Sequence, residues 1–174
     1  SALLITVACS SQEKEQHPEV IQSGAWQMNE YLPLLAGKKI GLVVNPSSKV
    51  KQAHLVDTLL RQGIKVKAIF GPEHGFRGNK YDGEIINDSI DPETGIPVIS
   101  LYGDHKKPTP EDLAGIELMI YDIQDVGARF YTYISTMHYV MEACAENNIP
   151  FAVFDRPNPN GYYVDGPVLD SAFR

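Results

Sequence analysis

The chain has 174 residues, of which 43% are hydrophobic and 21% are charged. This is enough for one compact domain with a sizeable core. The formal net charge is −7, which argues against a nucleic-acid backbone as partner because phosphates are bound by basic surfaces. The charge does not discriminate for or against a neutral or singly charged sugar.

The first 24 residues are expected to lie outside the folded domain. The apolar residues 2–8 lead to Cys9, and a polar stretch at 10–16 follows. This pattern resembles the end of a bacterial lipoprotein signal peptide, with Thr6 in place of the usual Leu and no basic segment before it. A run this short cannot span a bilayer, which takes about 20 residues. We expect residues 1–24 to be a signal-like tether that is lipidated at Cys9, in a periplasmic or outer-membrane protein; a chance apolar N-terminus is the alternative.

The rest of the chain alternates between two hydrophobic patterns, one typical of buried strands and one of helices. In chain order the patterns predict strand 39–45, helix 54–62, strand 64–70, strand 97–102, a helix that starts near Thr109, strand 116–123, helix 130–147 and strand 150–154. The segment 71–96 is far longer than the usual connection of about 4–6 residues, so it is expected to be functional or mobile. The alternation favours an α/β fold with a parallel sheet covered by helices on both faces.

Polar residues follow almost every predicted strand, and ligands of open α/β sheets bind outside the carboxyl ends of the strands. Each polar residue alone is also typical of a turn. Together they predict a polar cleft with several carboxylates, whose pKa values can be pushed apart. The residues at these ends are Asn45, Ser48, the segment 71–78, Asp122, Gln124, Asp125, Arg129, Asp155, Arg156 and Asn158.

Glu73 is the strongest candidate for a general acid. The glycines around it let the backbone approach a ligand closely. Pro72 and Phe76 would partly desolvate its carboxyl group and raise its pKa. A surface glutamate in a mobile loop is the alternative. His74 is a weaker candidate, either for orienting Glu73 or for binding substrate.

Asp122 and Asp125 are candidates for a second carboxylate, which would stabilise an oxocarbenium-like transition state, activate water or bind sugar hydroxyls. Arg129 would either pair with one of them or bind a substrate carboxylate in a bidentate way. Tyr131 would either stack on a sugar or belong to the core.

Several common signatures are absent from the sequence. No G-x-G-x-x-G follows the first strand, and there is no P-loop, no G-x-S-x-G elbow and no Cys/His cluster with zinc spacing. We therefore expect neither a cofactor nor a metal.

Three segments are long enough to be specific: GPEHGFRG at 71–78, YDIQDVGARFYTYISTM at 121–137 and DRPNPNG at 155–161. Shorter matches at 41–48, 94–103 and 165–174 support them. Together these segments resemble a bacterial family that was long a domain of unknown function and is now associated with exo-acting β-N-acetylmuramidases of peptidoglycan recycling.

The resemblance implies a Rossmann-like N-terminal catalytic domain at 25–174, followed in the family by a second α/β domain that this chain is expected to lack. An incomplete cleft would leave the chain inactive by itself. Glu73 matches the family's proposed catalytic glutamate, and Pro46-Ser47-Ser48 after Asn45 departs from many relatives. The predicted catalytic residues are Glu73, Asp122 and Asp125. The predicted substrate-binding residues are Asn45, His74, Arg77, Gln124, Arg129, Tyr131, Asp155 and Asn158.

The function implied is hydrolysis that releases terminal N-acetylmuramic acid from peptidoglycan fragments, with Glu73 as general acid/base. The expected partners are muropeptides and disaccharides that contain N-acetylmuramic acid. Two alternatives stay open. One is a non-catalytic envelope lipoprotein that binds muropeptides or another acidic sugar. The other is a nucleotide-binding domain, which lacks its glycine fingerprint.

Overall fold

The computed structural model describes residues 21–72, 75–77 and 89–173. The predictions for Cys9, Glu73 and His74 fall on residues outside these ranges.

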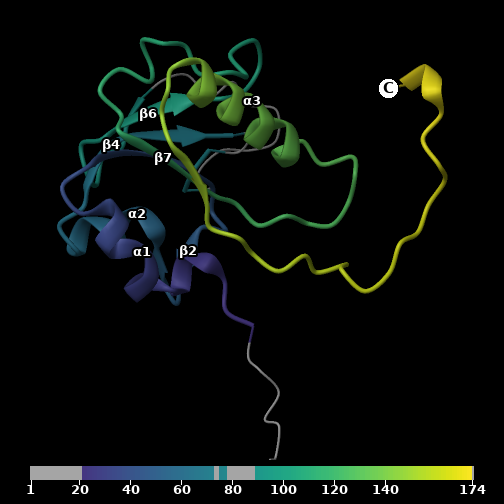
Figure 1. Cartoon of the computed structure of the whole chain (residues 1–174), viewed down its shortest axis with the longest axis horizontal. Helices are drawn as coiled ribbons and strands as arrows, with labels where there is room; N and C mark the ends of the chain where they lie inside the picture. The colour runs from purple at the N-terminus through teal and green to yellow at the C-terminus, as the bar shows by residue number, and fades with distance from the viewer. Residues whose placement is uncertain (1–20, 73–74, 78–88, 174) are drawn as a thin grey trace, which may run out of the picture.

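A six-stranded sheet with the order β5-β6-β4-β1-β7-β8 forms the centre of the fold (Figure 1). Its five parallel strands are β1 (Lys39–Val44), β4 (Lys65–Gly71), β6 (Pro97–Ser100), β7 (Leu118–Asp122) and β8 (Phe151–Val153). They confirm the five predicted strands. The short edge strand β5 (Ser89–Ile90) runs antiparallel to β6 and was not predicted. A separate hairpin, β2 (Lys49–Val50) and β3 (Ala53–His54), follows β1.

The strand order places a topological switch point at the middle of the sheet. From β1 the chain proceeds outward through β4 to β6 on one side, and then crosses back to β7 and β8 on the other. The register pairs Val44, the last residue of β1, with Asp122, the last residue of β7. The turns after these two strands therefore meet at the same edge, where ligands of open α/β sheets bind.

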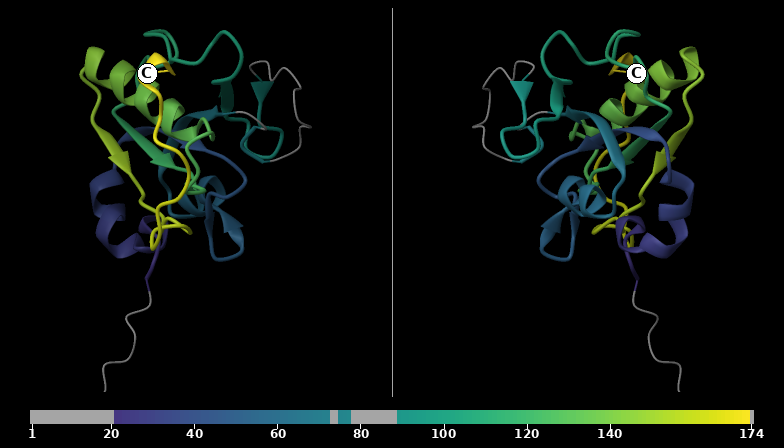
Figure 2. Two further views of the ribbon diagram at one scale, coloured as in Figure 1. Left: turned by 90° about the vertical axis from the view of Figure 1, so that its right-hand side faces the viewer. Right: turned by 90° about the vertical axis from the view of Figure 1, so that its left-hand side faces the viewer.

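Helices cover both faces of the sheet, as predicted. Helices α1 (Met28–Leu35) and α2 (Leu55–Arg61) lie on one face, and α3 (Tyr133–Glu146) lies on the other (Figures 1 and 2). The alternation of side chains along β1 explains the two layers. Leu42 belongs to the core with α1 and α2, whereas Val43 belongs to the core with α3. The fold is a Rossmann-like α/β fold.

Three helical details also differ from the expectations. The helix expected near Thr109 is wrong: residues 110–115 form turns, and Gly115 adopts a φ of +74°, which ends them before a helix can propagate. The helix expected at 130–147 begins only at Tyr133. Helix α1 was not predicted, because it contains Pro33 and depends on tertiary contacts such as the Tyr31 ring against Phe154, at 4.3 Å between centroids.

No helix in the described part of the chain is long and apolar enough to cross a membrane.

Two helical leucines test the assignment of the core. Leu59 in α2 has no exposed surface, whereas Leu34 in α1 is 63% exposed. We expect Leu59→Ala to lower the free energy of unfolding by about 2–5 kcal/mol, because it removes buried methyl groups and leaves a cavity. The matched control Leu34→Ala should change it by about 0.5 kcal/mol or less. Urea unfolding followed by circular dichroism measures both, and equal losses would contradict this core.

Candidate functional site

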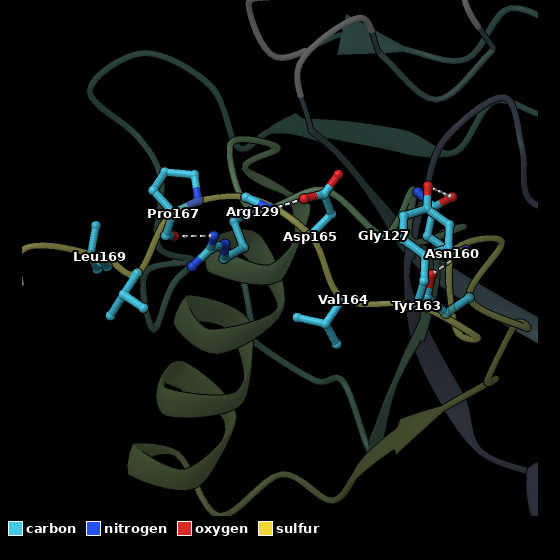
Figure 3. Close-up of a pocket in the computed structure, with 11 residues that line it drawn as sticks. Gly127, Arg129, Asn160, Tyr163, Val164, Asp165, Pro167 and Leu169 are labelled. Atoms are coloured by element: carbon cyan, nitrogen blue, oxygen red, sulfur yellow. Dashed lines mark hydrogen bonds between the residues drawn. The ribbon is translucent and has the colours of Figure 1, made fainter.

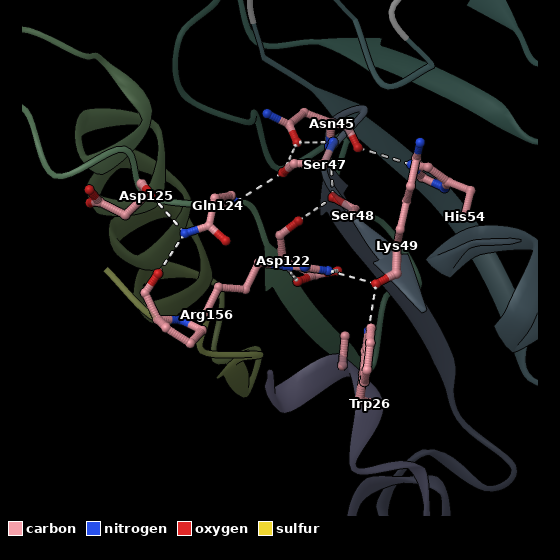
Figure 4. A network of polar contacts seen from close by, with 12 residues as sticks. Trp26, Asn45, Ser47, Ser48, Lys49, His54, Asp122, Gln124, Asp125 and Arg156 are labelled. Atoms are coloured by element: carbon pink, nitrogen blue, oxygen red, sulfur yellow. Dashed lines mark hydrogen bonds and ion pairs between the residues drawn. The ribbon is translucent and has the colours of Figure 1, made fainter. Parts of the chain in front are cut away.

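The turn after β1 is held rigid by its own polar groups (Figure 4). The backbone N–H of Asn45 donates to Ser48 Oγ at 2.9 Å, and its carbonyl oxygen lies 3.0 Å from His54 Nε2. Asn45 Oδ1 accepts hydrogen bonds from both the backbone N–H and the hydroxyl of Ser47, at 2.9 and 2.5 Å. Such a turn, in which an asparagine side chain binds the backbone two residues on, is a common use of Asn.

The two serines also join this turn to the end of β7. Ser48 Oγ donates to the carbonyl oxygen of Asp122. Ser47 Oγ accepts from the backbone N–H of Gln124 at 3.1 Å. The residues after β1 and after β7 therefore form one connected polar network at the switch point of the sheet.

Asp122 is the buried charge of this network. Its side chain is fully buried and bound by Arg156, with Nε to Oδ1 at 2.5 Å and Nη2 to Oδ2 at 2.9 Å. Burial raises the pKa of Asp122 above its ordinary value, and the Arg156 guanidinium opposes this rise. Arg156 Nη2 also donates to the carbonyl oxygen of Lys49. Both carboxylate oxygens of Asp122 thus accept hydrogen bonds within the protein, which is typical of a structural ion pair. A catalytic role for Asp122 stays a prediction.

Asp125 and Asp155 occupy a different position. Both line a pocket of about 220 Å³ beyond the ends of β7 and β8, together with Arg156, Tyr133 and apolar residues of α3. Asp125 is exposed, and its Oδ1 accepts a hydrogen bond from the backbone N–H of Gly127 at 2.5 Å. Gln124 connects the polar network to this pocket, because its Nε2 donates to the carbonyl oxygens of Asp125 and Pro157, each at 2.8 Å. This pocket brings two predicted site carboxylates together.

Arg129 and Asn158 line a larger pocket of about 640 Å³, shown in Figure 3. Arg129 Nη2 donates to the carbonyl oxygen of Pro167 at 2.8 Å. Within the described ranges Arg129 has no ion pair, so pairing with Asp122 or Asp125 is not observed. The guanidinium therefore keeps donors for a ligand. Asn158 Oδ1 accepts from the backbone N–H of Asn160 at 2.8 Å.

Tyr131 is 46% exposed, and its ring lies 5.4 Å from Phe130 and 6.2 Å from Tyr133 between centroids. It is thus not a core residue, and its exposed ring is suited to stack on a sugar.

Arg77, predicted to bind substrate, is held by two carboxylates, and its substrate-binding role stays a prediction. Its guanidinium donates to both oxygens of Asp57 at 3.2 and 3.0 Å and to both oxygens of Asp91 at 3.1 and 3.0 Å. It also lies 4.9 Å from the centre of the Phe76 ring. These hydrogen bonds to Asp57 and Asp91 raise the pKa of Arg77. All three of its nitrogens donate hydrogen bonds. Arg77 therefore joins α2, through Asp57, to the segment after β5, through Asp91.

Four residues whose side chains belong to the network were not among the predicted catalytic and substrate-binding residues: Ser47, Ser48, His54 and Arg156. The sequence Asn-Pro-Ser-Ser was a signal for a side-chain-bonded turn, and Arg156 was the cation that a buried Asp122 requires. His54 carried no signal. It caps α2, where Nδ1 accepts from the Val56 N–H at 3.3 Å, and burial lowers its pKa.

Among the described residues no group of three or more His, Cys, Asp or Glu is arranged to hold a metal ion.

The Asp122–Arg156 pair gives a stability prediction. Arg156→Ala leaves a buried carboxylate without its counter-charge and should lower the free energy of unfolding by about 3–5 kcal/mol. The double variant Asp122→Asn/Arg156→Ala should lose clearly less than the sum of the two single variants, because the charge and its partner leave together. Arg129→Ala is the matched control and should cost about 0.5 kcal/mol or less. Additive losses in urea unfolding would argue against this pair.

Comparison with known proteins places the chain in a family. Residues 40–174 match the family described as Exo-beta-N-acetylmuramidase NamZ, N-terminal. The chain is 46% identical over 176 residues to the peptidoglycan beta-N-acetylmuramidase NamZ of Bacillus subtilis (strain 168), and the alignment covers 97% of this chain and 42% of that protein.

Two crystal structures of DUF1343 family proteins from Bacteroides fragilis NCTC 9343 have the same fold. They superpose with TM-scores of 0.75 and 0.77 at 45% and 42% sequence identity, over 87% of this chain and 39% of each of theirs. The chain thus spans about two fifths of the length of the relatives it matches. With the family match, the sequence identity and the shared fold in agreement, the chain belongs to the NamZ N-terminal family.

Proposed function

We propose that the protein is an exo-acting glycoside hydrolase that releases terminal N-acetylmuramic acid from peptidoglycan-derived glycans. The observation that carries this proposal is the 46% identity, along nearly the whole chain, to a peptidoglycan beta-N-acetylmuramidase. The structure supports it with a polar edge at the switch point of the sheet, where Asp125 and Asp155 line one pocket and Arg129 lines another, all from segments that follow β7 and β8.

Glu73 is the proposed general acid. It follows β4 in the sequence, and β4 lies next to β1, so the carboxyl ends of both strands share one edge. The glycosidic C1–O bond breaks as the carboxyl group of Glu73 gives its proton to the leaving oxygen. Water supplies the oxygen of the new C1–O bond.

Asp125 is the better placed of the two candidates for the second carboxylate. It is exposed beside a pocket, whereas Asp122 is buried and bound by Arg156. An ionised carboxylate at this point stabilises positive charge on the sugar ring or accepts the proton of water. Asp122 then acts as a positioning residue, because it fixes the end of β7 from which Asp125 projects.

Arg129 is the proposed partner of the acidic group of the sugar. N-acetylmuramic acid carries a lactyl carboxylate, and a guanidinium binds a carboxylate through two parallel hydrogen bonds. The 640 Å³ pocket around Arg129 leaves room for such a group. Tyr131 would contribute a ring face for the sugar.

We also propose that the protein is tethered to the cell envelope by lipid on Cys9, as the apolar run before this residue suggests. Expression of the full-length gene in a bacterial host with an alkyne-tagged fatty acid tests this. The label should appear on the wild type and on Cys144→Ser, whose thiol is buried in the core, and should be absent from Cys9→Ser. Equal labelling of Cys9→Ser and Cys144→Ser, or no labelling of the wild type, would contradict the proposal that lipid is attached to Cys9.

The catalytic proposal is tested with p-nitrophenyl β-N-acetylmuramide and the full-length protein. Glu73→Gln should lower kcat by about 10²–10⁴-fold, because proton transfer to the leaving oxygen is lost, and should change KM little. The exposed Glu111→Gln is the control and should match the wild type. Unchanged turnover in Glu73→Gln would refute its role, and binding of muropeptides without any turnover by the wild type would favour the non-catalytic alternative.

A further inference from the structure

The side-chain amide of Asn45 has only one orientation that its neighbours accept. The backbone N–H of Ser47 is always a donor, and it lies 2.9 Å from the Asn45 atom assigned as Oδ1. Placing the NH₂ group there would set two donors against each other. The oxygen of the Asn45 amide therefore faces Ser47, and the NH₂ group faces the other way.

The hydroxyl of Ser47 strengthens this preference. Its oxygen accepts from the backbone N–H of Gln124 at 3.1 Å, so its single proton is available for Asn45 Oδ1 at 2.5 Å. A hydroxyl that accepts from one side donates more strongly on the other. Ser47 thus connects the amide after β1 to the backbone after β7.

The result is a fixed donor at the switch point. Asn45 is only 5% exposed, and both its backbone groups and Oδ1 have partners, whereas Nδ2 has no acceptor among the described residues. In Figure 4 this nitrogen points away from Ser47 and out of the network. A buried asparagine held in this way presents two N–H donors at no further cost in side-chain entropy when a ligand arrives.

We propose that Ser47 is a positioning residue that fixes the Asn45 amide so that Nδ2 donates to the acetamido carbonyl oxygen of the bound sugar. This inference rests on the proposed function for the identity of the sugar. Of the acceptor groups on N-acetylmuramic acid, the carboxylate is matched by a guanidinium at Arg129, and the uncharged acetamido carbonyl is matched by an amide donor. Ser47 and Asn45 then determine selection for the N-acetyl group.

Three variants of the full-length protein test the proposal by steady-state kinetics on p-nitrophenyl β-N-acetylmuramide. Ser47→Ala removes the hydroxyl and should raise KM about fivefold with kcat within about twofold, as expected for one neutral hydrogen bond made in both the ground and the transition state. Ser47→Thr keeps the hydroxyl and should restore the wild-type KM. Asn45→Asp keeps the acceptor that Ser47 needs but replaces the donor, and should raise KM at least about tenfold.

Equilibrium binding separates this proposal from the proposed function. The dissociation constants of N-acetylmuramic acid and muramic acid, measured by calorimetry, give the preference for the acetyl group. This preference should fall about fivefold in Ser47→Ala and return in Ser47→Thr. If the wild type binds with this pattern but does not turn over substrate, the inference holds and the hydrolase proposal fails.

Other outcomes would overturn the inference. An unchanged acetyl preference in both Ser47→Ala and Asn45→Asp excludes the amide contact, and equal losses in Ser47→Ala and Ser47→Thr exclude the hydroxyl as its support. A wild type that binds neither sugar removes both proposals. If Ser47→Ala does not fold, as judged by thermal unfolding, Asn45→Asp decides alone, because it leaves the turn's acceptor in place.

Discussion

The buried ion pair between Asp122 and Arg156 is the constraint on which the site depends. A carboxylate with no exposed surface is costly unless a counter-charge and hydrogen bonds satisfy it. Arg156 supplies two hydrogen bonds to Asp122 from the segment after β8, and it reaches the hairpin after β1 through the Lys49 carbonyl. One guanidinium therefore fixes the ends of β7 and β8 and the hairpin after β1 relative to one another. Asn45, Gln124, Asp125 and Asp155 of the candidate site lie in the segments beside these ends.

The polar residues of the site fall into two groups, one that positions the strand ends and one that is available to bind a ligand. The first group, Asp122, Arg156, Ser47 and Ser48, is buried or half-buried, makes hydrogen bonds to other protein groups and sets positions. The second group, Asp125, Arg129 and Tyr131, is exposed and keeps capacity for a ligand, and Asp125 and Arg129 each line a pocket. Asn45 connects the two groups. Its Oδ1 accepts hydrogen bonds from Ser47 of the first group, whereas its Nδ2 has no acceptor among the described residues. In such a division one set of residues holds the site in position, so that the residues that bind the ligand keep their hydrogen-bonding groups free for it.

The sequence predicted the parallel sheet and its two helical faces because five short apolar runs alternate with helical patterns. It missed α1, whose Pro33 weakens the helical signal and whose Tyr31 is buried against Phe154, a contact across 123 positions that no local pattern reveals. It placed Asn45, Gln124, Asp125 and Asp155 at one edge correctly, because parallel strands end together. It could not separate Arg129, which has no ion pair among the described residues, from Arg77, which two aspartates hold. The partners of Arg77, Asp57 and Asp91, lie 20 and 14 positions away.

The central claim is that the sugar binds where the turns after β1 and β7 meet. Backbone amide resonances of the ¹⁵N-labelled protein, followed during titration with N-acetylmuramic acid, test this most directly. The account predicts that the largest shifts cluster at residues 45–48 and 122–129. Shifts that cluster instead at the pocket of about 270 Å³ lined by Leu101, Lys106 and Thr136, with residues 45–48 unmoved, would contradict it.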